Sequence, residues 1–233
     1  MDRRRVALLS LIAAALGFGC AEPDREQAEQ AMASGGDAEP REITPASSPF
    51  LDEARLAVDE LGREVHALGL QYADAAGSRA EEWDVTQRSI MEVREQVEAD
   101  LARAGAAGPE ALEDARVDIV AGLQTLTERV DRAQLEAVEG GQEFVSASEA
   151  ELMEIDGRIE SLRLQAAQRG DAAGNEVALE LEALRASADE IAAALASMSA
   201  ATEDEIAETR EEMAQSIASL SGSVQRQWLE LRG

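Results

Sequence analysis

The sequence predicts an all-α protein: a long, antiparallel, up-down-up three-helix coiled-coil bundle that follows a disordered tether. Apolar side chains recur at spacings of three and four residues from Phe50 to the C-terminus, whereas half-buried strands would alternate apolar and polar residues. Aromatic residues make up only 3% of the chain, and helix-favouring alanine, leucine, glutamate and arginine dominate instead. Glycine and proline interrupt the apolar pattern at intervals that suit helix ends.

The three expected helices span about residues 50–104, 110–169 and 176–232. Each expected end combines an arginine in the last turn with a glycine just beyond it, which together stabilise a helix C-terminus. These pairs are Arg103 and Gly105, Arg169 and Gly170, and Arg232 and Gly233, and the starts are predicted at Ser48–Pro49, Pro109–Glu110 and Asn175–Glu176. Connections of about five residues make consecutive helices antiparallel. The result would be a rod of about 80 Å, with residue 50 and the 170–175 loop at one end and the 105–109 loop and C-terminus at the other.

The heptad phase slips once in each expected helix, and the three slips would lie at one level of the rod. They occur near Gly77–Ser78, Gly140–Gly141 and Thr202. Tyr72, Phe144 and Met198 would then be neighbours on one side of this level, and Trp83 would approach residues 131–137. One interpretation is a packing adjustment that lets the seams change register, in which case alanine at both 140 and 141 should raise stability by about 1 kcal/mol. The alternative is a hinge or a partner site.

The first nineteen residues have the organisation of a cleavable signal peptide. Arg3–Arg5 precede the apolar run Val6–Phe18, which is too short to span a hydrocarbon core of ~30 Å. The run ends at Cys20, the only cysteine in the chain. The stretch from Gly17 to Cys20 resembles the lipobox of bacterial lipoproteins, although that class prefers leucine at the position of Gly17 and a small residue at that of Phe18. The alternative interpretation is an incidental cysteine in an ordinary secretory signal.

The resemblance implies cleavage before Cys20, a thioether-linked diacylglycerol on its sulfur and an acyl chain such as palmitate on its amino group. Several acyl chains form a stable membrane anchor, because each buried CH₂ contributes ~0.8 kcal/mol. In Gram-negative members, an aspartate after the cysteine favours the inner membrane. Ala21 occupies that position here, which implies an outer-membrane protein that faces the periplasm.

The chain therefore divides into a signal peptide (1–19), the lipidated Cys20 with a flexible acidic tether (20–48), and the three-helix rod (49–233). The tether prediction depends on Pro23, Pro40 and Pro45 and on the near absence of large apolar side chains between residues 21 and 48. Such a segment buries too little surface to order itself. As a random coil it would span about 30 Å, enough to hold the rod clear of the lipid headgroups.

The composition also limits the partners. The chain carries a formal charge of −27 and contains no lysine; removal of residues 1–19 takes away one acid and three arginines, which leaves −29. Such a surface repels phosphate backbones, so no nucleic-acid partner is expected. His66 is the only histidine and is expected on a solvated helix flank. No catalytic, cofactor-binding or metal site is predicted, and the acidic run from Glu203 to Glu212 is interpreted as a solvated face.

These features favour a non-enzymatic lipoprotein of the cell envelope that acts as a structural spacer, a scaffold or a protein-interaction arm. Its expected partners are membrane lipid, through acylated Cys20, and an unidentified protein. Trp228 is expected near the far end of the rod, where it would close the end of the seam or contact a partner. Two alternatives stay open: a chaperone-like holder of exported proteins, and a ligand sensor that uses the discontinuity in the middle of the rod.

Overall fold

The computed structural model describes residues 48–73, 78–106 and 109–232, and all regular secondary structure in these ranges is α-helical. Six helices follow one another in this described part of the chain: α1 (Pro49–Tyr72), α2 (Ser78–Ala106), α3 (Pro109–Ala137), α4 (Gly141–Arg169), α5 (Ala172–Met198) and α6 (Glu203–Arg232). The predicted signal peptide, Cys20 and nearly all of the tether lie outside the described residues.

The all-α prediction is confirmed, but the three-helix rod is not. The helix expected at 50–104 is divided into α1 and α2, the one at 110–169 into α3 and α4, and the one at 176–232 into α5 and α6. Each division lies where the heptad phase slips in the sequence. At Gly140 the backbone has φ +83° and ψ 143°, a conformation that L-residues rarely adopt and that ends a regular helix. The second slip therefore marks a reversal of the chain, not a change of register within one helix.

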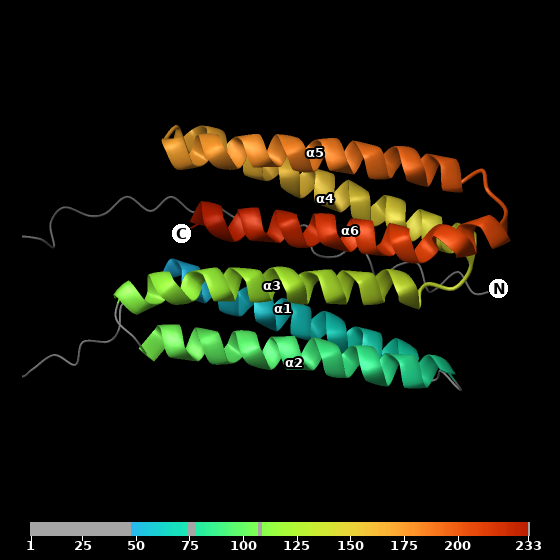
Figure 1. Cartoon of the computed structure of the whole chain (residues 1–233), viewed down its shortest axis with the longest axis horizontal. Coiled ribbons are helices and arrows are strands. Elements are labelled where there is room, and N and C mark those ends of the chain that lie inside the picture. Colours follow the sequence, from blue (N-terminus) through green and yellow to red (C-terminus); the bar gives the residue numbers. More distant parts are fainter. Residues whose placement is uncertain (1–47, 74–77, 107–108, 233) are drawn as a thin grey trace, which may run out of the picture. The chain divides into compact units, whose positions relative to one another are not determined.

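The six helices form two halves, each a three-helix bundle (Figure 1). We call α1–α3 the N-terminal half and α4–α6 the C-terminal half. The central helices α3 and α6 lie side by side and join the halves, with α1 and α2 packed against α3, and α4 and α5 packed against α6. Since α3 and α6 run in opposite directions, the first turn of one lies beside the last turn of the other.

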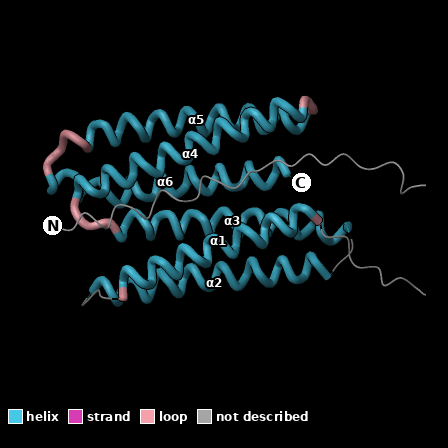
Figure 2. Tube along the Cα trace, turned by 180° about the vertical axis from the view of Figure 1, so that it is seen from behind, coloured by secondary structure: helices cyan, strands magenta, loops and turns pink. Residues whose placement is uncertain are grey.

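All helix ends gather at two ends of the bundle. The α3–α4 and α5–α6 connections share one end, which we call the turn end, whereas the start of α1, the α4–α5 connection and the end of α6 share the other, the terminal end (Figure 2). The Arg232 guanidinium pairs with Glu53, and Arg116 Nη2 donates to the Glu230 carbonyl at 3.3 Å. The prediction that the C-terminus lies far from residue 50 is therefore wrong, because folding each long helix in half returns the chain to its starting end.

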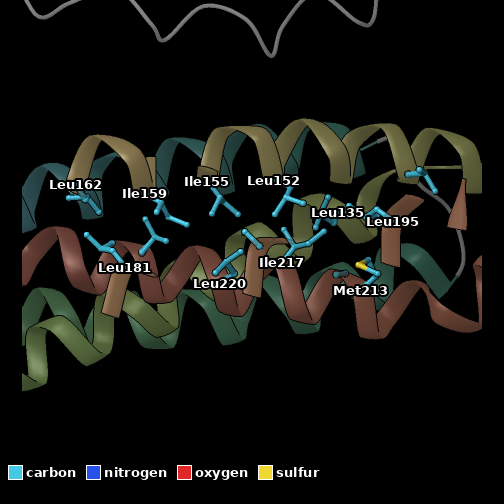
Figure 3. Close-up of a cluster of buried hydrophobic side chains, with 14 of the residues drawn as sticks. Leu135, Leu152, Ile155, Ile159, Leu162, Leu181, Leu195, Met213, Ile217 and Leu220 are labelled. Atoms are coloured by element: carbon cyan, nitrogen blue, oxygen red, sulfur yellow. The ribbon is translucent and has the colours of Figure 1, made fainter. Parts of the chain in front are cut away.

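Each half has its own hydrophobic core. In the C-terminal half, leucine and isoleucine side chains of α4 meet those of α5 and α6 (Figure 3). The fully buried members there include Phe144, Ile155, Ile159, Leu181 and Ile217, and those of the N-terminal half include Ile90, Ile119, Leu123, Leu126 and Val130. Two residues pack in the core of the opposite half: Leu135 of α3 belongs to the C-terminal core, and Leu229 of α6 belongs to the N-terminal core. Trp228 packs against both cores, at the terminal end and not at a far tip.

Several predicted helix ends are confirmed. α1 starts at Pro49, α3 starts at Pro109, and α4 ends at Arg169 before Gly170, whose φ of 65° is left-handed. α5 starts earlier than the predicted Asn175–Glu176. Asp171 precedes its first turn and accepts a hydrogen bond from the Gly174 amide at 2.7 Å, so Asp171 is the N-cap.

The contact between α3 and α6 uses a second buried face on each helix. On α3 this face carries Val120, Thr127 and Asp131, all at most 8% exposed. On α6 it carries small and polar residues at helical spacing, namely Ala214, Ala218, Ser221, Gly222 and Gln225. A Cβ at Gly222 would lie 2.5 Å from Glu128 Cγ and 3.0 Å from the Gln124 carbonyl oxygen. Glycine is therefore what allows the two central helices to approach so closely.

Candidate functional site

Where the two halves join, three carboxyl groups from different helices lie close enough to influence one another electrostatically. Glu64 of α1, Asp131 of α3 and Glu151 of α4 come from three helices, and the charges of Glu64 and Glu151 each act electrostatically on their neighbours in this group. Glu64 is held to α3 by Gln134, whose Nε2 donates to Glu64 Oε2 at 3.2 Å. We call Glu64, Asp131 and Glu151 the carboxyl cluster.

Burial raises the pKa of all three members. Burial and the neighbouring charge of Glu60 raise the pKa of Glu64 to about 7. Burial raises the pKa of Asp131 to about 7, an effect that the facing Ser221 partly opposes and the charge of Glu64 strengthens. Burial and the charge of Asp131 raise the pKa of Glu151 to about 7. The cluster is therefore partly protonated near neutral pH, where ordinary carboxyl groups, with pKa values near 4, are fully ionised.

Buried side chains of α3, α4 and α6 include polar atoms without hydrogen-bond partners. Asp131 is 8% exposed and its Oδ2 lacks a hydrogen-bond partner. The Oγ atoms of Ser221 on α6 and Ser148 on α4 also lack partners, and both serines are 0% exposed. Ser221 faces Asp131 without forming a hydrogen bond of normal geometry. An ionised carboxylate is poorly satisfied here, because burial removes water and the protein supplies too few donors.

The charges around the cluster are mixed but mainly negative. Glu60 lies beside Glu64 on α1, and Glu154 and Arg158 of α4 act on both Glu64 and Asp131. Arg158 is the counter-charge, and its Nη2 also donates to Gln225 Oε1 of α6 at 3.4 Å. Side chains of α1, α3, α4 and α6 thus converge on the joint between the halves.

A second polar centre lies at the turn end, where two arginines cover the last turn of α3. Arg210 of α6 donates from Nη2 to the carbonyls of Leu135 and Glu136, at 3.2 and 3.3 Å, and to that of Val138. Arg79 of α2 donates to the Ala137 carbonyl at 3.1 Å. These carbonyls belong to the last turn of α3 and to the residue that follows it, so the two cations stabilise the C-terminal end of the helix and its dipole.

Aromatic rings support both arginines. The Arg79 guanidinium lies 5.6 Å from the centre of the Tyr72 ring, which stacks on Trp83 at 4.8 Å. The Arg210 guanidinium lies 4.8 Å from the centre of the Phe144 ring. Tyr72 packs on the N-terminal core, whereas Phe144 and Met198 belong to the C-terminal core, so these three residues share an end of the bundle but not one cluster. Trp83 does line one surface with Ala133 and Glu136, as the sequence predicts.

Several carboxylates of the acidic run at the start of α6 have structural partners. Glu203 Oε2 accepts a hydrogen bond from the Gly141 amide at 2.8 Å, so α6 caps the start of α4. Glu205 Oε2 accepts from the amide and the hydroxyl of Thr202, both at 2.8 Å, and this is a capping box. Glu211 pairs with Arg132 of α3 at 2.9 Å. The solvated face predicted from sequence therefore also fixes helix starts.

We expect Thr202→Ala to lower the free energy of unfolding by about 1 kcal/mol, because it removes the capping hydroxyl of α6. Urea denaturation monitored by circular dichroism would measure the change. Thr209→Ala is the matched control, since Thr209 Oγ1 bonds the Glu205 carbonyl on the exposed surface of the same helix. The control should change stability by less than about 0.5 kcal/mol. Equal effects of the two variants would contradict the capping role.

An open depression of about 370 Å³ lies between α2 and α3. Its lining includes Glu92, Asp100 and Asp118 together with Arg129. Asp100 is buried but partnered, because it pairs with Arg103 and accepts from Gln96 Nε2 at 3.1 Å. The Arg129 Nη1 atom donates to the Ser89 carbonyl at 2.6 Å. Asp100 and Arg129 are thus committed to the helices that form the depression, whereas Glu92 and Asp118 are exposed.

The sequence-predicted site residue, Cys20, lies outside the described part of the chain. His66 is exposed on α1, as expected. The carboxyl cluster was not foreseen from the sequence. A usable signal was the spacing of Val120, Thr127 and Asp131, which marks a second face on α3 beside the apolar seam.

Within residues 48–73, 78–106 and 109–232, no group of three or more His, Cys, Asp or Glu residues is arranged to hold a metal ion. None of the helices described has a stretch long and apolar enough to cross a membrane. Comparison of the chain with models of protein families, with curated proteins and with solved structures gives no match.

Proposed function

We propose that this chain is a lipid-anchored protein of the cell envelope whose helical domain serves as a scaffold or protein-interaction arm. The proposed anchor is acylated Cys20, joined to the domain by the tether of residues 21–48. In a Gram-negative host the proposed location is the periplasmic face of the outer membrane. The signal-like leader with its terminal cysteine supports the anchor, and the strongly acidic helical domain supports a role in contacts with other proteins.

The observation that carries the proposal is the polarity of the bundle. α1 begins at the terminal end, where Glu53 pairs with Arg232 in the last turn of α6. A tether that leads into α1 therefore attaches at this end. The turn end is about 43 Å away along helices of 29 residues, at 1.5 Å per residue. With the tether attached at the terminal end, the turn end is the part of an anchored domain farthest from the attachment point.

The exposed surface of the turn end is acidic. Arg79 and Arg210 are occupied by the α3 carbonyls and Arg79 also pairs with Glu139, whereas most of the described acids around them have no cationic partner and are exposed. These exposed acids are Glu81, Glu82, Asp84, Glu139, Glu143, Glu203, Asp204, Glu205 and Glu208. A protein partner that recognises this end would carry arginine and lysine, and complementary charge would speed association and make it sensitive to salt.

Site-specific photo-crosslinking in intact cells tests the proposal. A photoreactive residue at Glu139, on the turn end, should give a discrete crosslinked protein of basic surface that mass spectrometry identifies. The matched control is the same residue at Glu176, which is exposed near the start of α5 at the terminal end. Weaker or no crosslinking from Glu176 is expected. Equal, diffuse crosslinking from both positions would contradict a partner at the turn end.

A further inference from the structure

The joint between the two halves contains buried carboxyl groups, which a purely structural contact does not need. Replacing Asp131 and its neighbours by apolar residues would suit a purely structural contact between α3 and α6, since buried carboxyl groups are costly. Asp131 is instead buried within this contact, opposite Ser221. Carboxyl groups from α1 and α4 converge on it from the two sides.

The cluster is placed where it acts on both halves at once. Glu64 and Asp131 belong to the N-terminal half, and Glu151 with Ser221 and Ser148 belongs to the C-terminal half. Ionisation of Glu64 and Glu151 places like charges on opposite sides of the joint, with Asp131 between them. Protonation removes this repulsion and also provides O–H donors for acceptors that lack them, such as Ser221 Oγ or a second carboxylate.

We propose that the carboxyl cluster is a proton-operated latch, which holds the N-terminal and C-terminal halves together when it is protonated and loosens their contact when it is ionised. The charged groups that face Asp131 are Glu64 of α1 and Glu151, Glu154 and Arg158 of α4, with the Ser221 hydroxyl on α6. Arg158 favours the ionised state and is outnumbered by the surrounding carboxylates. Arg158 acts on all three members, but one cation does not neutralise three carboxylates, so their ionisation leaves net negative charge at the joint.

The direction of the pH effect follows from proton binding. The carboxyls have pKa values of about 7 in the folded chain, against 3.8 for aspartate and 4.5 for glutamate as ordinary values. At pH values between the ordinary and the raised pKa, the folded chain binds more protons than the unfolded chain. The free energy of unfolding therefore falls as the pH rises from about 4.5 towards 7, and it levels off above about 8. The three groups are coupled, so they titrate as a set over this range.

The latch itself does not depend on the lipid anchor. A role for the latch in the cell does rest on the proposed function, because a domain outside the cytoplasmic membrane would be exposed to the pH outside the cytoplasm. Fractionation of the Cys20→Ser chain tests the location, whereas the latch is measured on purified protein. Failure of one proposal is therefore distinguishable from failure of the other.

The first test is the urea midpoint of the full chain with Cys20→Ser, measured from pH 5 to pH 8. We expect the midpoint to fall as the pH rises. Asp131→Asn should raise the midpoint at pH 8 and reduce the slope against pH by about a third or more, since it removes one of three coupled groups. Glu151→Gln, a second variant at the edge of the joint, should act in the same direction. Asp118→Asn, an exposed acid on the same helix, should keep the original slope.

The second test measures the joint directly. Spin labels on cysteines introduced by Val85→Cys in α2 and Ser187→Cys in α5 report the distance between the halves. The distance distribution should be narrow at pH 5 and broader at pH 8, and Asp131→Asn should keep it narrow at both. A distribution that does not change with pH, or a slope and distribution in Asp131→Asn equal to those of the parent, would overturn the latch.

Discussion

Cys20→Ser should move the protein from the membrane fraction to the soluble fraction almost completely. The acyl chains proposed on Cys20 supply the anchoring free energy, at ~0.8 kcal/mol per buried CH₂. The helical domain is not expected to replace them, because a chain cleaved before Cys20 would carry a charge of −29, which anionic lipid headgroups repel. The measurement is membrane fractionation with immunoblotting, together with the mass of the N-terminal peptide, which should carry the acyl chains in the parent protein.

Two controls make the fractionation decisive. Ala21→Ser changes the neighbouring residue and keeps the cysteine, so this variant should stay in the membrane fraction. A chain with an ordinary cleavable secretory signal in place of residues 1–20 should be soluble, which separates the acyl anchor from an uncleaved leader. Membrane association of that chain would show that the helical domain binds the membrane by itself and would exclude the proposed anchor.

The periodicity of the sequence was sufficient to predict helices and to locate their interruptions. Gly140 lies at both a predicted phase slip and an observed turn, and Gly170 at both a predicted and an observed helix end. What periodicity cannot distinguish is a register change from a chain reversal. A helix that continues and a helix that folds back expose the same spacing of apolar residues on either side of the break, so tertiary packing decides between them.

The joint between the halves was missed for a related reason. Ala214, Ala218 and Ser221 form the buried second face of α6, yet small and polar residues do not register as a hydrophobic seam. Asp131 directly follows the seam residue Val130 and resembles an exposed flank residue in the sequence. Its burial depends on how α4 and α6 pack beside α3. The spacing of Val120, Thr127 and Asp131 marks a second face on α3, but which helices cover that face follows only from the topology.

Gly140→Ala should lower the free energy of unfolding by about 1–3 kcal/mol, because a residue with a Cβ is strained at φ +83° and ψ 143°. A Cβ there would also lie 2.1 Å from Glu143 Oε2, although that side chain can move. Gly157→Ala is the matched control on α4. Gly157 is exposed inside the helix, and a Cβ added to it would meet nothing within 4 Å, so alanine there should raise stability by about 0.5–1 kcal/mol.

The sign of the Gly140→Ala effect distinguishes the six-helix bundle from the three-helix rod that the sequence favours. In the rod, residue 140 lies inside a continuous helix, so alanine should stabilise it as much as alanine does at Gly157. In the bundle, residue 140 reverses the chain and the same substitution strains it. Alanine at 141 adds to the strain, since its Cβ would lie 2.5 Å from Glu203 Oε2, the group that caps the first turn of α4. Opposite signs for Gly140→Ala and Gly157→Ala in urea denaturation are therefore expected, and equal stabilisation by both would restore the rod.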